Sequence, residues 1–173
     1  MAQLPRLDPL PAFNFYVALI DASDVTSTLV SGLTSFLLGG FSACSGLDST
    51  LTVEEYQEGG VNDRVHRFPS RFTFGNITLS RGVGFGESLW LWHEEFLTGR
   101  GTRRNGLIVL ADELRAPVKI WSFHRGIPVR WSGPGLDAGS SALAIESLEI
   151  AHERLELIVS PGKTLDGVLR VFR

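Results

Sequence analysis

Cysteine is nearly absent from this sequence, and basic residues are not in excess. Of the 173 residues only Cys44 is a cysteine, so no intramolecular disulfide can form and a cysteine-based zinc site is disfavoured. Lys and Arg number 16 against 19 Asp and Glu, which gives a net charge of −3. Because nucleic-acid binders hold phosphates with clustered Lys and Arg, this balance argues against a nucleic-acid-binding protein.

Long hydrophobic runs are also missing. Residues 1–11 contain three prolines and Asp8, and they lack the apolar core of a signal peptide. The most apolar early stretch, 29–41, is shorter than the roughly 20 residues of a spanning helix and is broken by Ser, Thr and Gly. With 43% hydrophobic and 20% charged residues, the composition predicts one soluble globular domain over residues 1–173, made in the cytoplasm.

No arrangement of residues typical of catalysis or of cofactor binding is found. The glycines at 82, 84 and 86 lack the following Lys-Ser/Thr of a phosphate loop, and no Gly-x-Ser-x-Gly elbow occurs. None of the four histidines has another histidine two to four positions away, as a metal-binding pair would. We therefore expect neither an enzyme nor a bound cofactor or metal, and we interpret Cys44 as a buried, inert thiol.

Apolar and polar residues alternate over most of the chain, a pattern typical of β-strands. We expect strands at 12–21, 50–56, 72–79, 107–110, 118–123, 129–131 and 142–157. One segment has helical spacing instead, because Leu89, Trp92 and Phe96 recur at i, i+3 and i+7 between Glu87 and Gly99. These elements predict a mainly β fold: a β-barrel or two packed antiparallel sheets with one flanking α-helix.

Two segments do not fit a small β domain that stands alone. Along 142–157 the apolar positions change parity twice, which a flat strand with one wet face cannot do. This strand either contains bulges or is covered on both faces, by its own domain and by a partner. Residues 54–67 are a long polar segment of both charge signs that turns at Gly59-Gly60, longer than a usual loop. Both features favour assembly of several subunits.

Six short stretches spread along most of the chain carry a further signal. They are residues 40–47, 54–63, 79–82, 89–92, 128–134 and 144–153. In this order they closely resemble the inner-tube proteins of contractile injection systems and contractile phage tails, over about residues 10–156. The haemolysin-coregulated protein of type VI secretion, which forms similar rings, is a relative of that family.

The resemblance implies a structural subunit without cofactor, substrate or enzymatic activity. Such proteins form hexameric rings that stack into a rigid hollow tube, within a contractile sheath and on a baseplate, with a spike at its tip. Sheath contraction drives the tube through a target membrane and delivers cargo from the lumen. The implied partners are copies of itself, sheath, baseplate and spike proteins, a tube-terminating cap and lumen cargo. The implied location is a phage-tail-like particle assembled in the bacterial cytoplasm.

The resemblance also assigns roles to three groups of residues. A hairpin arm that contacts neighbouring subunits or rings would contain Glu54, Glu55, Tyr56, Glu58, Gly59, Gly60, Val61, Asn62, Asp63 and Arg64. A strand of the sheet that lines the lumen would contain Ile145, Glu146, Ser147, Leu148, Glu149 and His152. The helix would be anchored on the outer side of the barrel by Leu89, Trp90 and Trp92.

The chain departs from the family pattern in two places, and two other functions stay open. Residues 22–38 form a longer connection than usual, and residues 157–173 extend beyond the usual end. The alternative function is a monomeric small-ligand-binding β-barrel, which predicts a monomer stabilised by a small molecule. A hydrolase on a β scaffold ranks lowest, because no nucleophile–base pair can be named.

Overall fold

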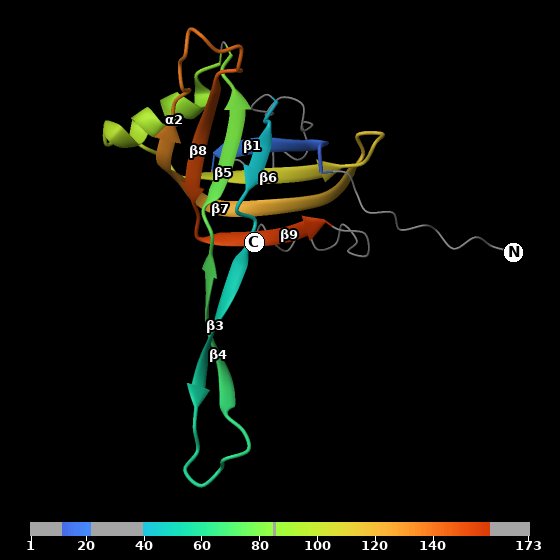
Figure 1. The fold of residues 1–173 in the computed structure, drawn as a ribbon, viewed down its shortest axis with the longest axis vertical. Helices are drawn as coiled ribbons and strands as arrows, with labels where there is room; N and C mark the ends of the chain where they lie inside the picture. Colours follow the sequence, from blue (N-terminus) through green and yellow to red (C-terminus); the bar gives the residue numbers. More distant parts are fainter. Residues whose placement is uncertain (1–11, 22–39, 85, 160–173) are drawn as a thin grey trace, which may run out of the picture.

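A computed structural model describes residues 12–21, 40–84 and 86–159 of the chain (Figure 1). The described strands and helix follow one another as β1 (Phe15–Asp21), β2 (Ala43–Ser45), β3 (Ser49–Tyr56), β4 (His66–Phe74), β5 (Ile77–Gly82), α2 (Ser88–Leu97), β6 (Arg104–Ala111), β7 (Pro117–Ser132), β8 (Ile145–Ala151) and β9 (Arg154–Val159). All strand pairs are antiparallel.

Seven strands form one open sheet that is organised around β7. Its strand order is β1-β6-β7-β8-β5-β2, and β9 also pairs with β7. The first part of β7 lies between β6 and β9, whereas its last residues pair with β8. The 16-residue β7 therefore belongs to two halves of the sheet that cross one another (Figure 1). Among the described strands, β1 and β2 lie at the two ends of this path and do not pair, so the sheet is not closed into a barrel.

The chain turns from one half of the sheet to the other at Arg125 and Gly126. Arg125 has a left-handed backbone (φ 53°), and the amide of Arg125 donates to the Asn105 side-chain oxygen at 2.9 Å. The ring of Phe123, which is fully buried, fills the inside of this corner. A Cβ atom on Gly106 would lie 2.2 Å from that ring, and one on Gly126 would lie 2.7 Å from it. The corner thus requires glycine at two positions because the phenyl ring occupies the space of their side chains.

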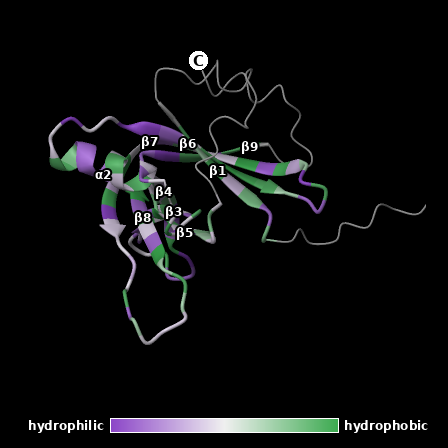
Figure 2. Cartoon of the chain, turned by 90° about the horizontal axis from the view of Figure 1, so that it is seen from above, coloured by the Kyte–Doolittle hydropathy of each residue, from purple (hydrophilic) through white to green (hydrophobic). Residues whose placement is uncertain are grey.

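The core lies between the two halves of the sheet and is closed by α2. One half contributes Val17, Leu19, Ile108 and Phe123, the other contributes Ile77, Leu79, Leu148 and Ile150, and the helix contributes Leu89 and Trp92. Seen from above, α2 and β8 lie at one side of the molecule and β1 and β9 at the other (Figure 2). Leu107 and Ile108 face opposite sides of β6, yet both are buried. Burial on both faces explains the continuous apolar run at 107–110.

The predicted fold class is confirmed: the fold is mainly β, with two antiparallel sheets, and α2 is the one helix among the described residues. The helix starts after Glu87 and ends before Gly99, which has a left-handed backbone (φ 73°). The expected strands 118–123 and 129–131 are a single strand, β7. The expected strand 72–79 is divided at Gly75-Asn76 into the end of β4 and the start of β5.

The prediction of one strand over 142–157 is wrong. The structure has two strands, β8 and β9, with a turn at His152-Glu153 where the amide of Glu153 donates to the carbonyl of His124 at 3.1 Å. β8 pairs with the end of β7 and β9 with its beginning. Each strand therefore faces a different half of the core. The buried positions of β8 are even, whereas in β9 Leu155 is partly buried against the core, Ile158 is buried and Leu157 is exposed. Neither a bulge nor a covering partner is needed to explain the parity change.

We predict that Gly106→Ala destabilises the subunit. The added methyl group would overlap the buried ring of Phe123, and overpacking of this kind lowers the free energy of unfolding by about 1–3 kcal/mol. Urea denaturation of the monomeric subunit measures the change. Gly135→Ala is the matched control, because a Cβ atom there meets nothing within 4 Å. Equal stability of the two variants would contradict the proposed packing at the corner.

Candidate assembly surfaces

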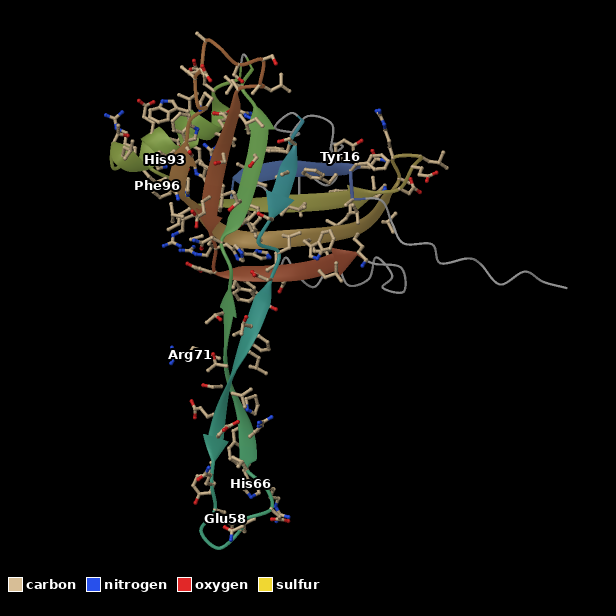
Figure 3. The ribbon with its side chains drawn as sticks, in the orientation of Figure 1. Tyr16, Glu58, His66, Arg71, His93 and Phe96 are labelled. Atoms are coloured by element: carbon tan, nitrogen blue, oxygen red, sulfur yellow. The ribbon has the colours of Figure 1, made fainter. Side chains whose placement is uncertain are left out.

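The most prominent surface feature is a hairpin arm that projects from the body of the subunit. It consists of β3, β4 and the tip loop 57–65 (Figures 1 and 3). β3 and β4 form a two-stranded sheet of their own and pair with no other described strand. Every residue of β3 is exposed. The arm therefore starts at Ser49 and ends at Phe74, so it is longer than the predicted segment 54–67.

The predicted arm residues lie in the distal half of this arm. Glu54, Glu55 and Tyr56 end β3, and the residues from Glu58 to Arg64 form the tip loop. Three of their carboxylates are engaged within the arm: Glu55 pairs with Arg67 at 3.1 Å, and Glu58 contacts the His66 imidazole at 3.3 Å. The Ser70 hydroxyl donates to Glu54 at 2.9 Å. These contacts cross from β3 to β4 or close the tip loop, so they support the shape of the hairpin.

Most of the exposed apolar side chains on the arm, all except Tyr56, were missed by the sequence analysis. Phe68 and Phe72 on β4 are 53% and 63% exposed. The other exposed apolar side chains of β3, the tip loop and β4 are Leu51, Val53, Tyr56 and Val65. In the sequence they alternate with polar residues as they would on a strand over a core. Only the tertiary structure shows that the described part of the subunit places no core beneath them.

The root of the arm is packed closely against the body. Gly46 has a left-handed backbone (φ 86°), and a Cβ atom there would lie 2.0 Å from the Asn76 carbonyl oxygen. The imidazole of His152 lies between the rings of Phe74, at the end of the arm, and Phe123, in the core, with ring centroids 5.7 and 6.0 Å away. Burial in this apolar contact lowers the pKa of His152 below its usual value. The neutral imidazole therefore connects the arm to the core.

The residues predicted for the lumen sheet divide between the two faces of β8. Glu146 and Leu148 are buried and point into the subunit. Ile145, Ser147 and Glu149 lie on the opposite face, where the Asn76 amide donates to Glu149 at 2.7 Å. His152 lies beyond the end of β8, at the root of the arm. Only the face with Ile145, Ser147 and Glu149 points away from the core. That this face lines a lumen stays a prediction.

Two of the three predicted helix anchors are fully buried. Leu89 and Trp92 are 0% exposed. The indole nitrogen of Trp92 donates to the Thr102 carbonyl at 3.0 Å, and the guanidinium of Arg104 lies 5.4 Å from the centre of its ring. Trp90 is half-buried on another side of α2 and packs edge-on against Trp131, with centroids 4.7 Å apart. That α2 lies on the outer side of an assembly stays a prediction.

A buried ion pair joins four elements at the end of the body opposite the arm. Arg81 on β5 and Glu146 on β8 face each other in the register of the sheet, and their side chains meet at 2.6 Å. The indole nitrogen of Trp131 on β7 donates to the second oxygen of Glu146 at 3.1 Å, and Arg81 also donates to the Gly86 carbonyl before α2. Both charged residues are only 7% exposed. The pair is thus fully engaged and defines the register of β5 and β8.

Comparisons with known proteins identify the family. A model of the T4-like virus tail tube protein gp19 family matches residues 11–156. The chain belongs to this family. A comparison with curated protein sequences gives no match.

Solved structures share the fold of this tail tube protein. A chain of the anti-feeding prophage (AFP) baseplate, 6-fold symmetrised, is 25% identical, covers 88% of this chain and 97% of its own length, and has a TM-score of 0.69. A chain of the AFP tube-terminating cap is 22% identical, with coverages of 92% and 97% and a TM-score of 0.76. A chain of the PVC sheath–tube complex in the extended state, from an extracellular contractile injection system, is 21% identical, with coverages of 88% and 93% and a TM-score of 0.72.

The role of this tail tube protein is structural and not enzymatic. Within the described residues, no group of three or more His, Cys, Asp and Glu side chains could hold a metal ion. The same part of the chain has no helix that is both long and apolar enough to span a membrane.

Cys44 packs against the core, and burial raises the pKa of its thiol to about 11. Such a thiol is protonated at neutral pH, which disfavours a nucleophilic role.

We predict that Glu146→Gln strongly destabilises the tail tube protein. The change leaves the buried guanidinium of Arg81 without its counter-charge, and loss of one partner of a buried pair costs about 3–5 kcal/mol in the free energy of unfolding. The control is Glu55→Gln, which breaks the exposed pair with Arg67 and should cost about 0–1 kcal/mol. Thermal and urea denaturation compare the two. A small loss for Glu146→Gln would mean that this pair is not a structural requirement.

We also predict slow alkylation of Cys44 in the folded protein. At pH 8, a thiol of pKa about 11 contains about 100-fold less thiolate than one with a pKa of about 9. Because a thiolate of higher pKa is also more nucleophilic, iodoacetamide labelling followed by mass spectrometry should be about 10- to 100-fold slower in the native subunit than in urea. Similar rates in both states would show that the thiol is accessible and not desolvated.

Proposed function

We propose that this tail tube protein is the subunit of the rigid inner tube of a contractile injection system, in which rings of six copies stack into a hollow tube. Family membership supports the tube, and the likeness to a 6-fold symmetrised AFP baseplate chain supports the ring of six. The PVC relative comes from a complex of sheath and tube. On this basis the sheath surrounds the tube and its contraction drives the tube through a target membrane.

The exposed apolar surface of the arm is the observation that carries this proposal. An isolated two-stranded hairpin is at best marginally stable in water. Here the hairpin stands away from the body, and Tyr56, Phe68 and Phe72 are each more than half exposed. Apolar surface of this kind on a soluble protein marks an interaction site. A neighbouring copy that covers these side chains would stabilise the arm and the assembly together.

Unpaired strand edges support closure into a ring. Among the described strands, β1, β2 and β9 each pair with one strand only. Such an edge presents free backbone amide and carbonyl groups, which pair readily with another chain. Joining the edges of successive copies would extend the open sheet around a ring, and a ring that closes leaves no edge. The open sheet also argues against the alternative of a monomeric ligand-binding barrel, which needs a closed interior.

The remaining parts of the proposal follow from the relatives and from β8. The relatives belong to complexes with a baseplate, a tube-terminating cap and a sheath, and we propose partners of the same kinds here, in a particle assembled in the bacterial cytoplasm. The face of β8 with Ser147 and Glu149 would line the lumen, which would hold cargo. The residues from Glu54 to Arg64 would contact neighbouring copies through the tip of the arm.

We predict that the purified chain forms six-fold rings and hollow tubes, and that the arm is needed for them. Replacing Tyr56, Phe68 and Phe72 together by Ser removes the aromatic surface of the arm. The body has a separate core, so the variant should stay folded and fail to form tubes. Negative-stain electron microscopy and a mass measurement in solution test both statements.

The matched control is Leu114→Ser in the loop between β6 and β7. Leu114 is 89% exposed but lies on the body, so this variant should assemble like the wild type. Long tubes of the triple arm variant would show that the arm is not the assembly surface. A wild-type chain that stays monomeric, even with the neighbouring baseplate proteins, would overturn the tube proposal itself.

A further inference from the structure

A small cleft opens between α2 and the end of β7, beside the buried ion pair. Its volume is about 320 Å³, and its lining consists of Val83, Gly84, Gly86, Glu87, Trp90, Trp131 and Glu146. The two indole rings pack edge to face and form one wall. Gly84 and Gly86 also line the cleft.

The chemistry of the cleft fits a cationic side chain. The oxygens of Glu146 are already engaged by Arg81 and Trp131. Glu87, in contrast, is exposed at the rim and forms no ion pair with any described residue. A carboxylate beside two indole rings is a favourable site for a guanidinium, which combines an ion pair with a cation–π contact.

The arm carries a guanidinium that lacks a counter-charge. Arg71 on β4 is exposed, points away from the hairpin, and makes no hydrogen bond or ion pair with a described residue (Figure 3). Its neighbour in the chain is Phe72, one of the aromatic residues that assembly would cover. A charge in a surface that becomes buried must meet an opposite charge. Arg64, the other arm arginine without a partner, lies instead in the tip loop near Glu58 and Asp63.

The arm and the cleft lie at opposite ends of the subunit. β5 and β8 run along the body, with Ile77 and Ile150 next to the root of the arm and Gly82 and Ile145 at the far end. The ion pair of Arg81 and Glu146 and the cleft belong to this far end, where α2 also lies (Figure 1). A contact between them within one copy is therefore impossible, whereas a head-to-tail contact between copies can repeat without limit or close into a ring.

We infer that the Trp90–Trp131 cleft is the acceptor for the arm of another copy, which places Arg71 beside the two indole rings and against Glu87. This inference rests on the proposed self-assembly, and it adds the surface on which the arm is received. The interface is heterologous, because each copy donates an arm at one end and receives one at the other.

A charge-reversal cycle tests this inference. The variants are Arg71→Glu, Glu87→Arg and the double variant, and sedimentation measures the protein concentration at which half of the chain is assembled. Each single variant should raise this concentration at least about tenfold, which corresponds to about 1.4 kcal/mol. The double variant restores the ion pair with reversed signs and should return to within about threefold of the wild type. Trp90→Ala should weaken assembly as well, and thermal denaturation shows that each variant is folded.

Matched variants separate this contact from the general effect of charge. Arg115→Glu and Glu113→Arg reverse charges of the same kinds in the exposed loop between β6 and β7, and each should leave assembly unchanged. If wild-type chain assembles and the single variants assemble equally well, or if the double variant is not restored, the cleft is not the acceptor while the tube proposal stands. If the wild-type chain does not assemble, the proposed function fails, and this inference fails with it.

Discussion

The structure depends on the course of one strand, β7, through both halves of the sheet. Its first part pairs with β6 and β9 and its end pairs with β8, so the two halves are covalently continuous and cannot slide past one another. The corner between them is fixed by the ring of Phe123, which needs glycine at positions 106 and 126. Because the same ring also contacts His152, the corner supports the root of the arm. The same side chain thus contributes both to the corner and, through His152, to the packing at the root of the arm.

The far end of the body depends on a polar interaction instead. The apolar core between the two halves of the sheet leaves Arg81 and Glu146 facing each other near its edge, at 2.6 Å and almost without solvent. A buried pair is costly unless all its groups are bonded, and here Trp131 and the Gly86 carbonyl complete the bonding. The pair therefore favours one register of β5 and β8 over its neighbours. It also places Trp131 beside Trp90, and so creates the cleft.

Local sequence patterns predicted the fold class, the helix and several strands, because alternation and helical spacing reflect burial directly. They failed where the structure depends on distant pairing. Arg125-Gly126 resembles a turn, yet β7 continues through it because β6 and β8 hold its two ends. His152-Glu153 has no turn signal, yet the chain reverses there. On the arm, the charged residues and Gly59-Gly60 indicated the tip. Phe68 and Phe72, in contrast, alternate with polar residues as in a strand that covers a core. Whether a core lies beneath a strand is a tertiary property that alternation cannot report.

The distribution of charge and apolar surface on the arm indicates how its interactions are divided. Glu54, Glu55 and Glu58 make their contacts within the arm, so they favour the hairpin shape that a neighbouring copy then stabilises. Each of these contacts reduces the conformational freedom that the arm loses on binding, which leaves more of the apolar burial as net affinity. Apolar burial is not directional, however, and cannot alone select one register between copies. That selection must come from charges left unpaired, and in the aromatic part of the arm Arg71 is such a charge.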